Sequence, residues 1–372
     1  MALLGRAREL EAAGRDIVHM EIGEPDFATA EPVRRAGERA LAEGRTGYSP
    51  AAGLPALREA IAGHYRSRYS VDVEPGRILI TPGASGALVV ALALLADPGR
   101  NVLLPDPGYP CNRNFVEFVD AVPRAVRVDA DSDYQLTPAL AGQACDSATA
   151  AMLVGSPGNP TGTLATAADL QGLAALAAQR GIGLIVDEIY HGLHYDADPA
   201  QALRHAPDAI VVNSFSKYFG MTGWRLGWMV LPEDWVAGAE KLMQNLFISA
   251  STPAQYAALA CFEEASLAIF EARREAFRQR RDFLLPALRS LGFDIPGHPG
   301  GAFYLYADVG GLCADSGPFA SELLEQAGVA VTPGLDFECT APQRHLRFAY
   351  TTDRDRLAEG LERLRRFLAA GS

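Results

Sequence analysis

Lysine is the scarcest charged residue of this 372-residue chain, which has only Lys217 and Lys241. Long basic runs are also missing, and the formal net charge is -12. Both features argue against nucleic acid or an anionic membrane as a partner. No apolar run is long enough to span a membrane, and the N-terminal stretch lacks the apolar core of a secretory signal. We therefore expect no membrane partner.

Cysteines are few and show no pattern. The five are scattered and odd in number, and none forms a C-x-x-C pair. This spacing favours neither a disulfide framework nor a zinc cluster, and it fits a reducing, cytoplasmic location. His191 and His194 would share one face of a helix, but no further ligand type clusters near them in sequence. We predict no metal site.

Strands and helices alternate between about residues 77 and 231, which predicts an α/β fold with a mostly parallel central sheet flanked by helices. The continuous apolar run at residues 182–186 is typical of a strand in such a sheet. After Gly292 the pattern changes to short strands with long connections. We predict a large α/β domain at residues 28–266 and a smaller α+β domain from residues 1–27 and 267–372.

A long charged helix is predicted from about Leu267. Its apolar residues recur at helical spacing and mark a buried stripe: Phe270, Phe277, Leu284 and Leu288. The arginines between residues 273 and 281 would make its solvated face. Pro286 is expected to kink or end the helix, because proline removes a backbone hydrogen bond.

Lys217 follows a short β-branched strand at residues 209–213 and a turn with two hydroxyls, Ser214 and Ser216. A partly desolvated lysine loses proton affinity and becomes a usable amine nucleophile. The two hydroxyls and the fork-shaped donor Arg225 would suit a phosphate. An amine nucleophile beside a phosphate site is what pyridoxal phosphate requires. A solvated surface lysine is the alternative interpretation of Lys217 taken alone.

Other candidate site residues stand at strand ends or in rigid turns. Asp187 ends the apolar run at 182–186, and a carboxylate there is costly unless it is paired. The small-residue turn at 82–87 comes directly before a helix, as in anion sites. Tyr109 and Asn159 lie in turns restrained by prolines and glycines. Gly23 would let a ligand approach the backbone closely.

These signals occur in a fixed order along the chain. The motifs are Gly23-Glu-Pro-Asp-Phe27, Gly83-Ala-Ser-Gly86, Pro107-Gly-Tyr-Pro110, Asn159-Pro-Thr-Gly162, Asp187-Glu-Ile-Tyr190, Ser214-x-Ser-Lys217, Gly223-Trp-Arg225 and Leu346-Arg-Phe348. The series resembles the class I/II aminotransferases, which are fold type I pyridoxal phosphate enzymes. The resemblance covers essentially the whole chain. Its most specific part is Ser-x-Ser-Lys followed by Gly-Trp-Arg.

The resemblance implies roles for the residues around the cofactor, pyridoxal 5′-phosphate. Lys217 would hold it as a Schiff base and then move a proton between the substrate Cα and the cofactor's C4′ carbon. Asp187 would keep the pyridine nitrogen protonated. Asn159 and Tyr190 would hydrogen-bond the 3′ oxygen, and Tyr109 would stack on the ring.

The resemblance also implies a phosphate site and a substrate site. The phosphate would be held by Ala84, Ser85, Ser214, Ser216 and Arg225. Tyr48 would reach the phosphate of a neighbouring subunit, which implies a homodimer with shared sites. Arg347 would grip the substrate α-carboxylate, with Gly23 and Asn159 beside it. Arg344 stands near Arg347 in sequence and is the alternative for this role.

The sequence therefore predicts an aminotransferase that moves an amino group from an amino acid to a 2-oxo acid in a ping-pong cycle. A carbon–sulfur β-lyase with the same fold and cofactor is the closest alternative. A non-catalytic effector-sensing module is a further alternative, which the lack of a basic patch disfavours. Aromatic, aliphatic and acidic donors all stay open. Arg113 is a candidate for binding a second carboxylate, although a solvated arginine is the favoured interpretation.

Overall fold

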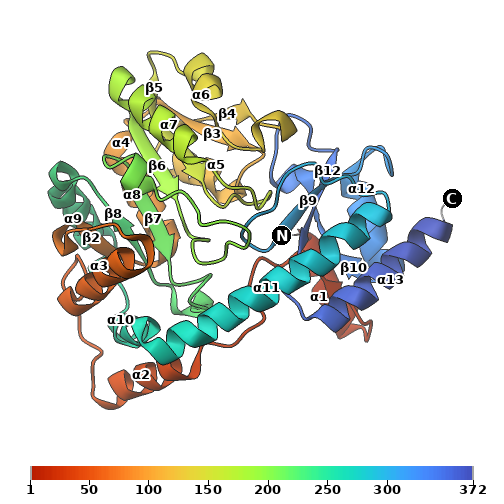
Figure 1. Ribbon diagram of the computed structural model, residues 1–372, viewed down its shortest axis with the longest axis horizontal. Helices are drawn as coiled ribbons and strands as arrows, with labels where there is room; N and C mark the ends of the chain where they lie inside the picture. The colour runs from red at the N-terminus through yellow and green to blue at the C-terminus, as the bar shows by residue number, and fades with distance from the viewer. Residues whose placement is uncertain (1, 371–372) are drawn as a thin grey trace.

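The computed structural model describes residues 2–370 and shows two groups of strands spanned by one long helix, α11 (Figure 1). Within the described residues, the central sheet has seven strands in the order β2-β8-β7-β6-β5-β3-β4. Neighbours from β4 to β7 pair in parallel, whereas β8 is antiparallel to both β7 and β2. The predicted α/β fold with a mostly parallel central sheet is confirmed.

The elements of the central sheet and of the helices around it alternate along the chain. Their bounds are α2 Glu31–Ala42, α3 Pro55–Tyr69, β2 Ile78–Thr81, α4 Gly83–Leu95, β3 Asn101–Asp106, α5 Pro110–Phe118, β4 Val122–Arg127, α6 Pro138–Ala144, β5 Thr149–Gly155, α7 Ala167–Arg180, β6 Gly183–Asp187, α8 Ala202–His205, β7 Ile210–Ser214, β8 Gly227–Val230, α9 Glu233–Phe247 and α10 Thr252–Leu259.

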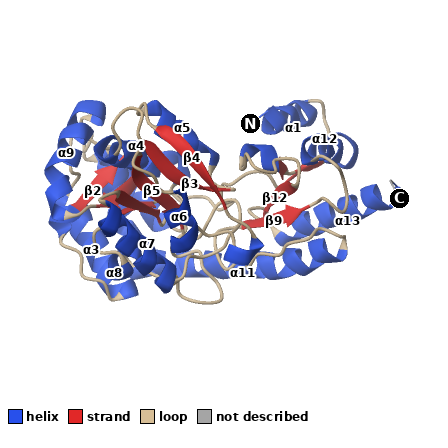
Figure 2. Ribbon diagram, turned by 90° about the horizontal axis from the view of Figure 1, so that it is seen from above, coloured by secondary structure: helices blue, strands red, loops and turns tan. Residues whose placement is uncertain are grey.

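Helices cover both faces of this sheet (Figure 2). On one face Leu88 of α4, Val116 of α5 and Met243 of α9 join the strands in one apolar core. The opposite face packs against α3, α6, α7 and α8. Strands buried on both faces must be apolar throughout, which is why β5, β6 and β7 read as continuous apolar runs. Polar side chains on these strands are therefore concentrated at their ends.

The remaining elements form a second, smaller group. Their bounds are α1 Ala2–Ala12, β1 Val18–His19, α11 Glu264–Ser290, β9 Tyr304–Asp308, α12 Ser316–Glu322, β10 Val329–Ala330, β11 Thr332–Pro333, β12 His345–Ala349 and α13 Arg354–Ala370. Strands β11, β12 and β9 form an antiparallel sheet, and β1 pairs in parallel with β10. The N-terminal segment thus lies against C-terminal elements. The predicted boundaries after residues 27 and 266 stay predictions.

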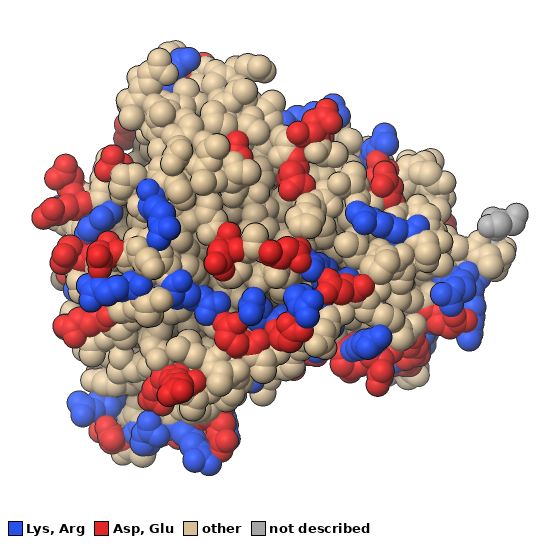
Figure 3. All heavy atoms as spheres, viewed as in Figure 1, with Lys and Arg blue, Asp and Glu red and all other residues tan. Residues whose placement is uncertain are grey.

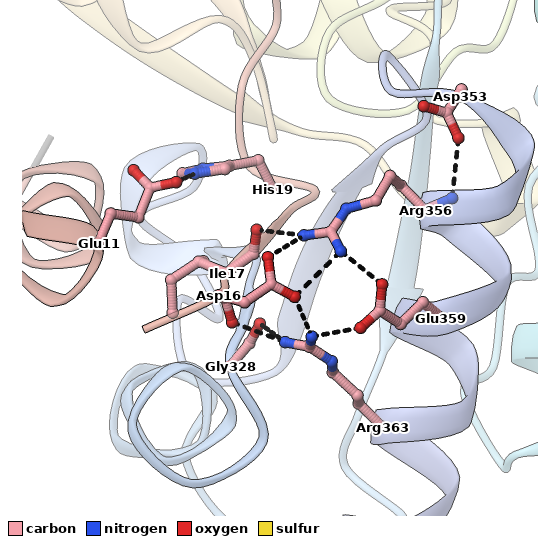
Figure 4. A network of polar contacts seen from close by, with 9 residues as sticks. All are labelled: Glu11, Asp16, Ile17, His19, Gly328, Asp353, Arg356, Glu359 and Arg363. Atoms are coloured by element: carbon pink, nitrogen blue, oxygen red, sulfur yellow. Dashed lines mark hydrogen bonds and ion pairs between the residues drawn. The ribbon is translucent and has the colours of Figure 1, made fainter. Parts of the chain in front are cut away.

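A charged network ties the N-terminal segment to α13 (Figure 4). Arg356 donates to Asp16 Oδ1 at 2.8 Å, and Arg363 donates to the Asp16 carbonyl oxygen at 2.7 Å. Hydrogen bonds from these two arginines lower the pKa of Asp16 to about 2. On the other side of the segment, His19 Nε2 lies 3.0 Å from Glu11 of α1. The network holds α1 and β1 in place beside α13.

Helix α11 departs from two sequence predictions. It begins at Glu264 and continues through Pro286 to Ser290, so an end at the proline is wrong, whereas a kink there stays a prediction. Arg280 and Arg281 are buried rather than solvated. Arg280 forms a two-bond ion pair with Asp26, and Arg281 pairs with Asp196. Loops from distant parts of the chain cover this side of the helix and supply the carboxylates that make the burial tolerable.

The surface mixes charges of both signs. On the face shown in Figure 3, acidic and basic side chains are interspersed. Along α11, for example, Arg278 pairs with both Glu275 and Asp282. None of the helices within residues 2–370 is long and apolar enough to cross a membrane.

Candidate active site

Two adjoining cavities lie where the parallel strands end and meet the smaller group of elements. One, of about 440 Å³, is lined by Gly23, Ala84, Ser85, Tyr109, Asp187, Ser214, Ser216, Lys217 and Arg225, among others. The second, of about 370 Å³, shares Gly23, Tyr109 and Lys217 and adds Asn159, Tyr190 and Arg347. The structure thus brings together all the predicted site residues except Tyr48. Ligands commonly bind at this carboxyl edge of a parallel sheet.

Lys217 and Asp187 share the first cavity. Lys217 lies on the turn after β7, and its Nζ donates to the Gly23 carbonyl oxygen at 2.8 Å. Burial, with a smaller effect from the positive charge of Arg347, lowers the pKa of Lys217 to about 8. Asp187 ends β6, and burial raises the pKa of its carboxyl to about 7. Both shifts favour the neutral forms, so Lys217 is a usable nucleophile near pH 8.

The start of α4 forms an anion-binding corner with the turn after β7. The helix begins at Gly83, four residues earlier than predicted, so Ala84 and Ser85 lie on its first turn, where backbone N–H groups are free. Gly83 has a positive φ of 70°, and a Cβ there would lie 2.7 Å from an Arg225 guanidinium nitrogen. Ser214 Oγ accepts from the Ser216 backbone N–H at 3.0 Å. Arginine, hydroxyl and N–H donors therefore converge on one corner.

Arg347 lies on β12, at the wall of the second cavity. It donates to Asn159 Oδ1 at 2.9 Å and to the Glu21 carbonyl oxygen at 2.6 Å. Its guanidinium carbon lies 4.3 Å and 4.6 Å from the ring centroids of Tyr304 and Phe337. The buried Nε has no hydrogen-bond partner within the described residues. Arg344, the alternative by sequence, is instead mostly exposed and pairs with Asp308.

Tyr304 was missed by the sequence analysis. Its hydroxyl lies 3.0 Å from that of Tyr190, and its ring faces Arg347. The sequence showed it only as one of several aromatic residues in an expected strand, with no feature separating it from a core residue. Its position also explains why a glycine stands at position 23, because a Cβ there would lie 2.2 Å from the Tyr304 hydroxyl oxygen.

Gly23→Ala is expected to destabilise the fold by about 1–3 kcal/mol, the usual cost of overpacking a filled core. The Tyr304 ring is buried and held by Tyr190, so it cannot move aside freely. Urea unfolding of the cofactor-free protein measures the effect. Adding Tyr304→Phe to the same chain removes the hydroxyl and should recover part of the loss. Equal stability of Gly23→Ala and the natural chain would contradict this account.

Three predicted features lie outside the cavities. Tyr48 is 83% exposed and lines neither of them. His191 lies in a turn and His194 forms an isolated antiparallel bridge with Gly301, so the two do not share a helix face. Burial lowers the pKa of His191 to about 3 and of His194 to about 4, so both are neutral. Among the described residues, no three His, Cys, Asp or Glu side chains gather as metal ligands.

The fold and the site agree on one class of protein. The carboxyl edge of a mostly parallel sheet presents the half-buried Lys217, and a smaller antiparallel sheet places Arg347 in the adjoining cavity. This is the arrangement of fold type I aminotransferases. A solved aminotransferase from Mycobacterium tuberculosis matches the structure with a TM-score of 0.97 at 35% identity, covering 100% of this chain and 96% of that chain.

Sequence comparison identifies the family. Residues 15–364 match the family described as Aminotransferase class I and II, and the chain belongs to it. The valine–pyruvate aminotransferase of Mycobacterium tuberculosis is 35% identical over 96% of this chain and 92% of its own length. The aspartate/prephenate aminotransferase of Thermus thermophilus is 38% identical over 99% and 95%. The protein is therefore an aminotransferase. The names of these relatives differ in substrate, so similarity alone assigns none to this chain.

Proposed function

We propose that this aminotransferase uses pyridoxal 5′-phosphate held on Lys217, in a ping-pong cycle between an amino acid and a 2-oxo acid. The observation that carries the proposal is the half-buried amine of Lys217, one of two lysines in the chain, in one cavity with Asp187. When bound, this cofactor supplies an aldehyde for a lysine amine and a ring that withdraws electrons from the substrate's α-carbon. The residues that line the cavity show whether this cofactor would fit.

The donor set fits a phosphate at one end of the cavity. Ala84 and Ser85 would offer backbone N–H groups at the start of α4, and the hydroxyls of Ser214 and Ser216 and the guanidinium of Arg225 would complete the site. Gly83 supports this role, because any side chain there would press on Arg225. The natural glycine keeps the corner open to a ligand.

Asp187 fits the ring nitrogen. The pKa of its carboxyl is raised mainly because the group is buried, and the Ile189 N–H and the charge of Lys217 offset this only in part. A protonated ring nitrogen would supply the missing cation and keep Asp187 ionised. Asn159 and Tyr190 would donate to the 3′ oxygen, and Tyr109 would lie on the ring face. Their shared cavities support these roles.

Lys217 and Arg347 would have different roles toward the substrate, proton transfer and carboxylate binding. Once released from the cofactor, the neutral amine of Lys217 would take the proton from the substrate's α-carbon and later return it. Arg347 would bind the α-carboxylate, for which its unpartnered Nε and its position in the cavity are suited. The Gly23 backbone lies beside both groups. Fixing the carboxylate would hold the α-carbon within reach of Lys217.

We further propose a homodimer in which Tyr48 reaches the phosphate of the partner subunit. The support is that Tyr48 is a largely exposed aromatic side chain that contributes nothing to its own subunit's cavity. A cytoplasmic location stays a prediction.

A half-reaction tests the proposed function. The protein is purified with pyridoxal phosphate and mixed with single amino acids without an oxo-acid acceptor, while visible absorbance is followed. An aminotransferase loses the absorbance band of the lysine-bound cofactor and recovers it when a 2-oxo acid is added. Persistence of the band while pyruvate and ammonia accumulate from a sulfur amino acid would instead support the β-lyase. Absence of any cofactor band would overturn the cofactor assignment.

The attachment rate of pyridoxal phosphate to cofactor-free protein should depend on the lowered pKa of Lys217. Only the neutral amine attacks, so the rate should rise about tenfold per pH unit below pH 8 and level off above it. Borohydride trapping and peptide mass spectrometry measure it. Lys241, exposed on α9, is an internal control and should be labelled far less. A rate that keeps rising to pH 10 would contradict the lowered pKa.

A further inference from the structure

The second cavity extends beyond Arg347 into a region with mainly apolar walls. Leu3 and Leu4 come from α1, Ile22 from the segment after β1, and the other apolar side chains from the start of α5 and from the segments around β6 and β11. The aliphatic, proline and phenylalanine residues of the lining are Leu3, Leu4, Ile22, Pro110, Ile189, Val331, Pro333 and Phe337. If Arg347 binds the α-carboxylate and Lys217 lies at the α-carbon, a substrate side chain must extend toward these walls.

Within one chain, the described lining of the cavity offers no free cation for a second carboxylate. Among its described lining residues the cations are Lys217 and Arg347, both engaged in the proposed reaction. The lining also includes two acids, Glu21 and Asp336. Glu21 is 93% buried, with one oxygen 2.7 Å from His19 Nδ1 and the other without a partner within residues 2–370. Glu21 raises the pKa of His19 to about 9, so His19 is a cation already engaged by Glu21. A carboxylate placed here would therefore meet no free cation among the described residues of the chain.

Arg113 does not add a cation to this cavity. It lies on α5, four residues after Tyr109, but its guanidinium donates to the Asp336 carbonyl oxygen at 3.3 Å and contacts the Cys339 sulfur. Arg113 lines a neighbouring cavity and not the one that holds Arg347. The sequence-based candidate for a second carboxylate site is therefore directed elsewhere.

The wall made by α1 is held by specific contacts. Arg6 pairs with Glu325 at 2.6 Å, and Glu11 meets His19 at 3.0 Å. The Asp16 network then fixes the following segment to α13 (Figure 4). Leu3 packs partly against the apolar core. The helix that carries the two leucines is thus anchored at several points along its length and beyond its end.

We propose that the substrate of this site is an amino acid with an uncharged, apolar side chain, and that Leu3 and Leu4 form part of the wall that selects it. The inference rests on the proposed function. Apolar side chains gain by leaving water against these walls, whereas aspartate or glutamate loses hydration without gaining a counter-charge. The site accordingly prefers aliphatic or aromatic amino acids to dicarboxylic ones.

Single-turnover half-reactions of the cofactor-loaded enzyme test the preference, with leucine, methionine and phenylalanine compared with aspartate and glutamate. At least one apolar donor should exceed both acidic donors by tenfold or more in rate constant over Kd. Calorimetric titration with 4-methyl-2-oxopentanoate and oxaloacetate should give at least tenfold tighter binding of the apolar acid. Faster reaction of aspartate or glutamate would overturn the inference and leave the aminotransferase assignment intact. No reaction with any donor would overturn both.

Leu4→Arg tests the role of α1. A cation in the wall should shift the ratio of aspartate to leucine rate constants by tenfold or more toward aspartate. Val122→Arg adds the same charge at a half-exposed position on β4 and should leave the ratio unchanged. An unchanged ratio in Leu4→Arg, with cofactor still bound, would overturn the assignment of α1 to the wall. If Leu4→Arg fails to bind cofactor, Leu3→Ala and Leu4→Ala replace it. Both should lower the half-reaction rate constant with leucine more than that with aspartate.

Discussion

Replacing Lys217 by alanine is expected to lower the rate of amino transfer by more than about 10³-fold, because one group supplies both the covalent attachment and the proton transfer. No other described lysine lies in either cavity. Alanine also removes the hydrogen bond to the Gly23 carbonyl oxygen. Steady-state kinetics with the donor found in the half-reaction, and the absorbance of the bound cofactor, measure the two losses separately.

Lys241→Ala is the matched control, since it removes the other lysine from the exposed side of α9. It should keep both the rate and the cofactor band within about twofold, as surface substitutions usually do. If Lys217→Ala keeps a normal band that borohydride still traps on the chain, another amine holds the cofactor. The site would then be wrongly assigned.

Asp187→Asn is expected to lower kcat by about 10²–10⁴-fold, the range typical of groups that control protonation in catalysis. Asparagine matches aspartate in shape, so the hydrogen bond from the Ile189 backbone N–H can persist. The amide cannot supply the negative charge that keeps a ring nitrogen protonated. The loss should therefore appear in kcat more than in KM. Kinetics and the pH dependence of the cofactor spectrum would show it.

The neighbouring Glu188 provides a control with the same burial. Its carboxyl has a pKa raised to about 8 by burial, and one oxygen accepts from the Ala202 backbone N–H. Glu188 lines neither of the two cavities described above, and because it is mostly protonated at neutral pH, Glu188→Gln should keep kcat within about threefold. Equal losses in Asp187→Asn and Glu188→Gln would show that burial, rather than contact with the ring, explains the effect.

Asp187→Asn also has an effect that does not depend on turnover. The pKa of Asp187 lies above its value in an unfolded chain, so the native protein binds the extra proton between about pH 4 and 7. Stability contributed by this group is present at low pH and is lost as pH rises through 7. At pH 8 the cofactor-free variant should therefore melt at a higher temperature than the natural chain. Equal or lower melting temperature would contradict the raised pKa.

Most of the candidate site was predictable because its residues stand in local motifs. Asp187 ends a buried apolar strand, and Lys217 follows another at a turn rich in hydroxyls. These patterns depend on neighbours in sequence. The failures concern packing between distant segments: Arg280 and Arg281 were assigned to solvent by helical periodicity, but Asp26 and Asp196 meet them inside the protein. Nothing in the local sequence identifies such partners.

The order of the motifs by itself determined the class of fold. It also indicated the candidate nucleophilic lysine and the cofactor chemistry to be tested, because strand ends and turns can be recognised from short stretches of sequence. Only the tertiary structure placed Arg347 in the second cavity and Arg344 outside it, brought Tyr304 against Gly23, and placed α1 beside that cavity. These outcomes depend on how a second sheet packs over the first. Packing is set by the summed burial of many side chains and not by the few residues that mark a motif.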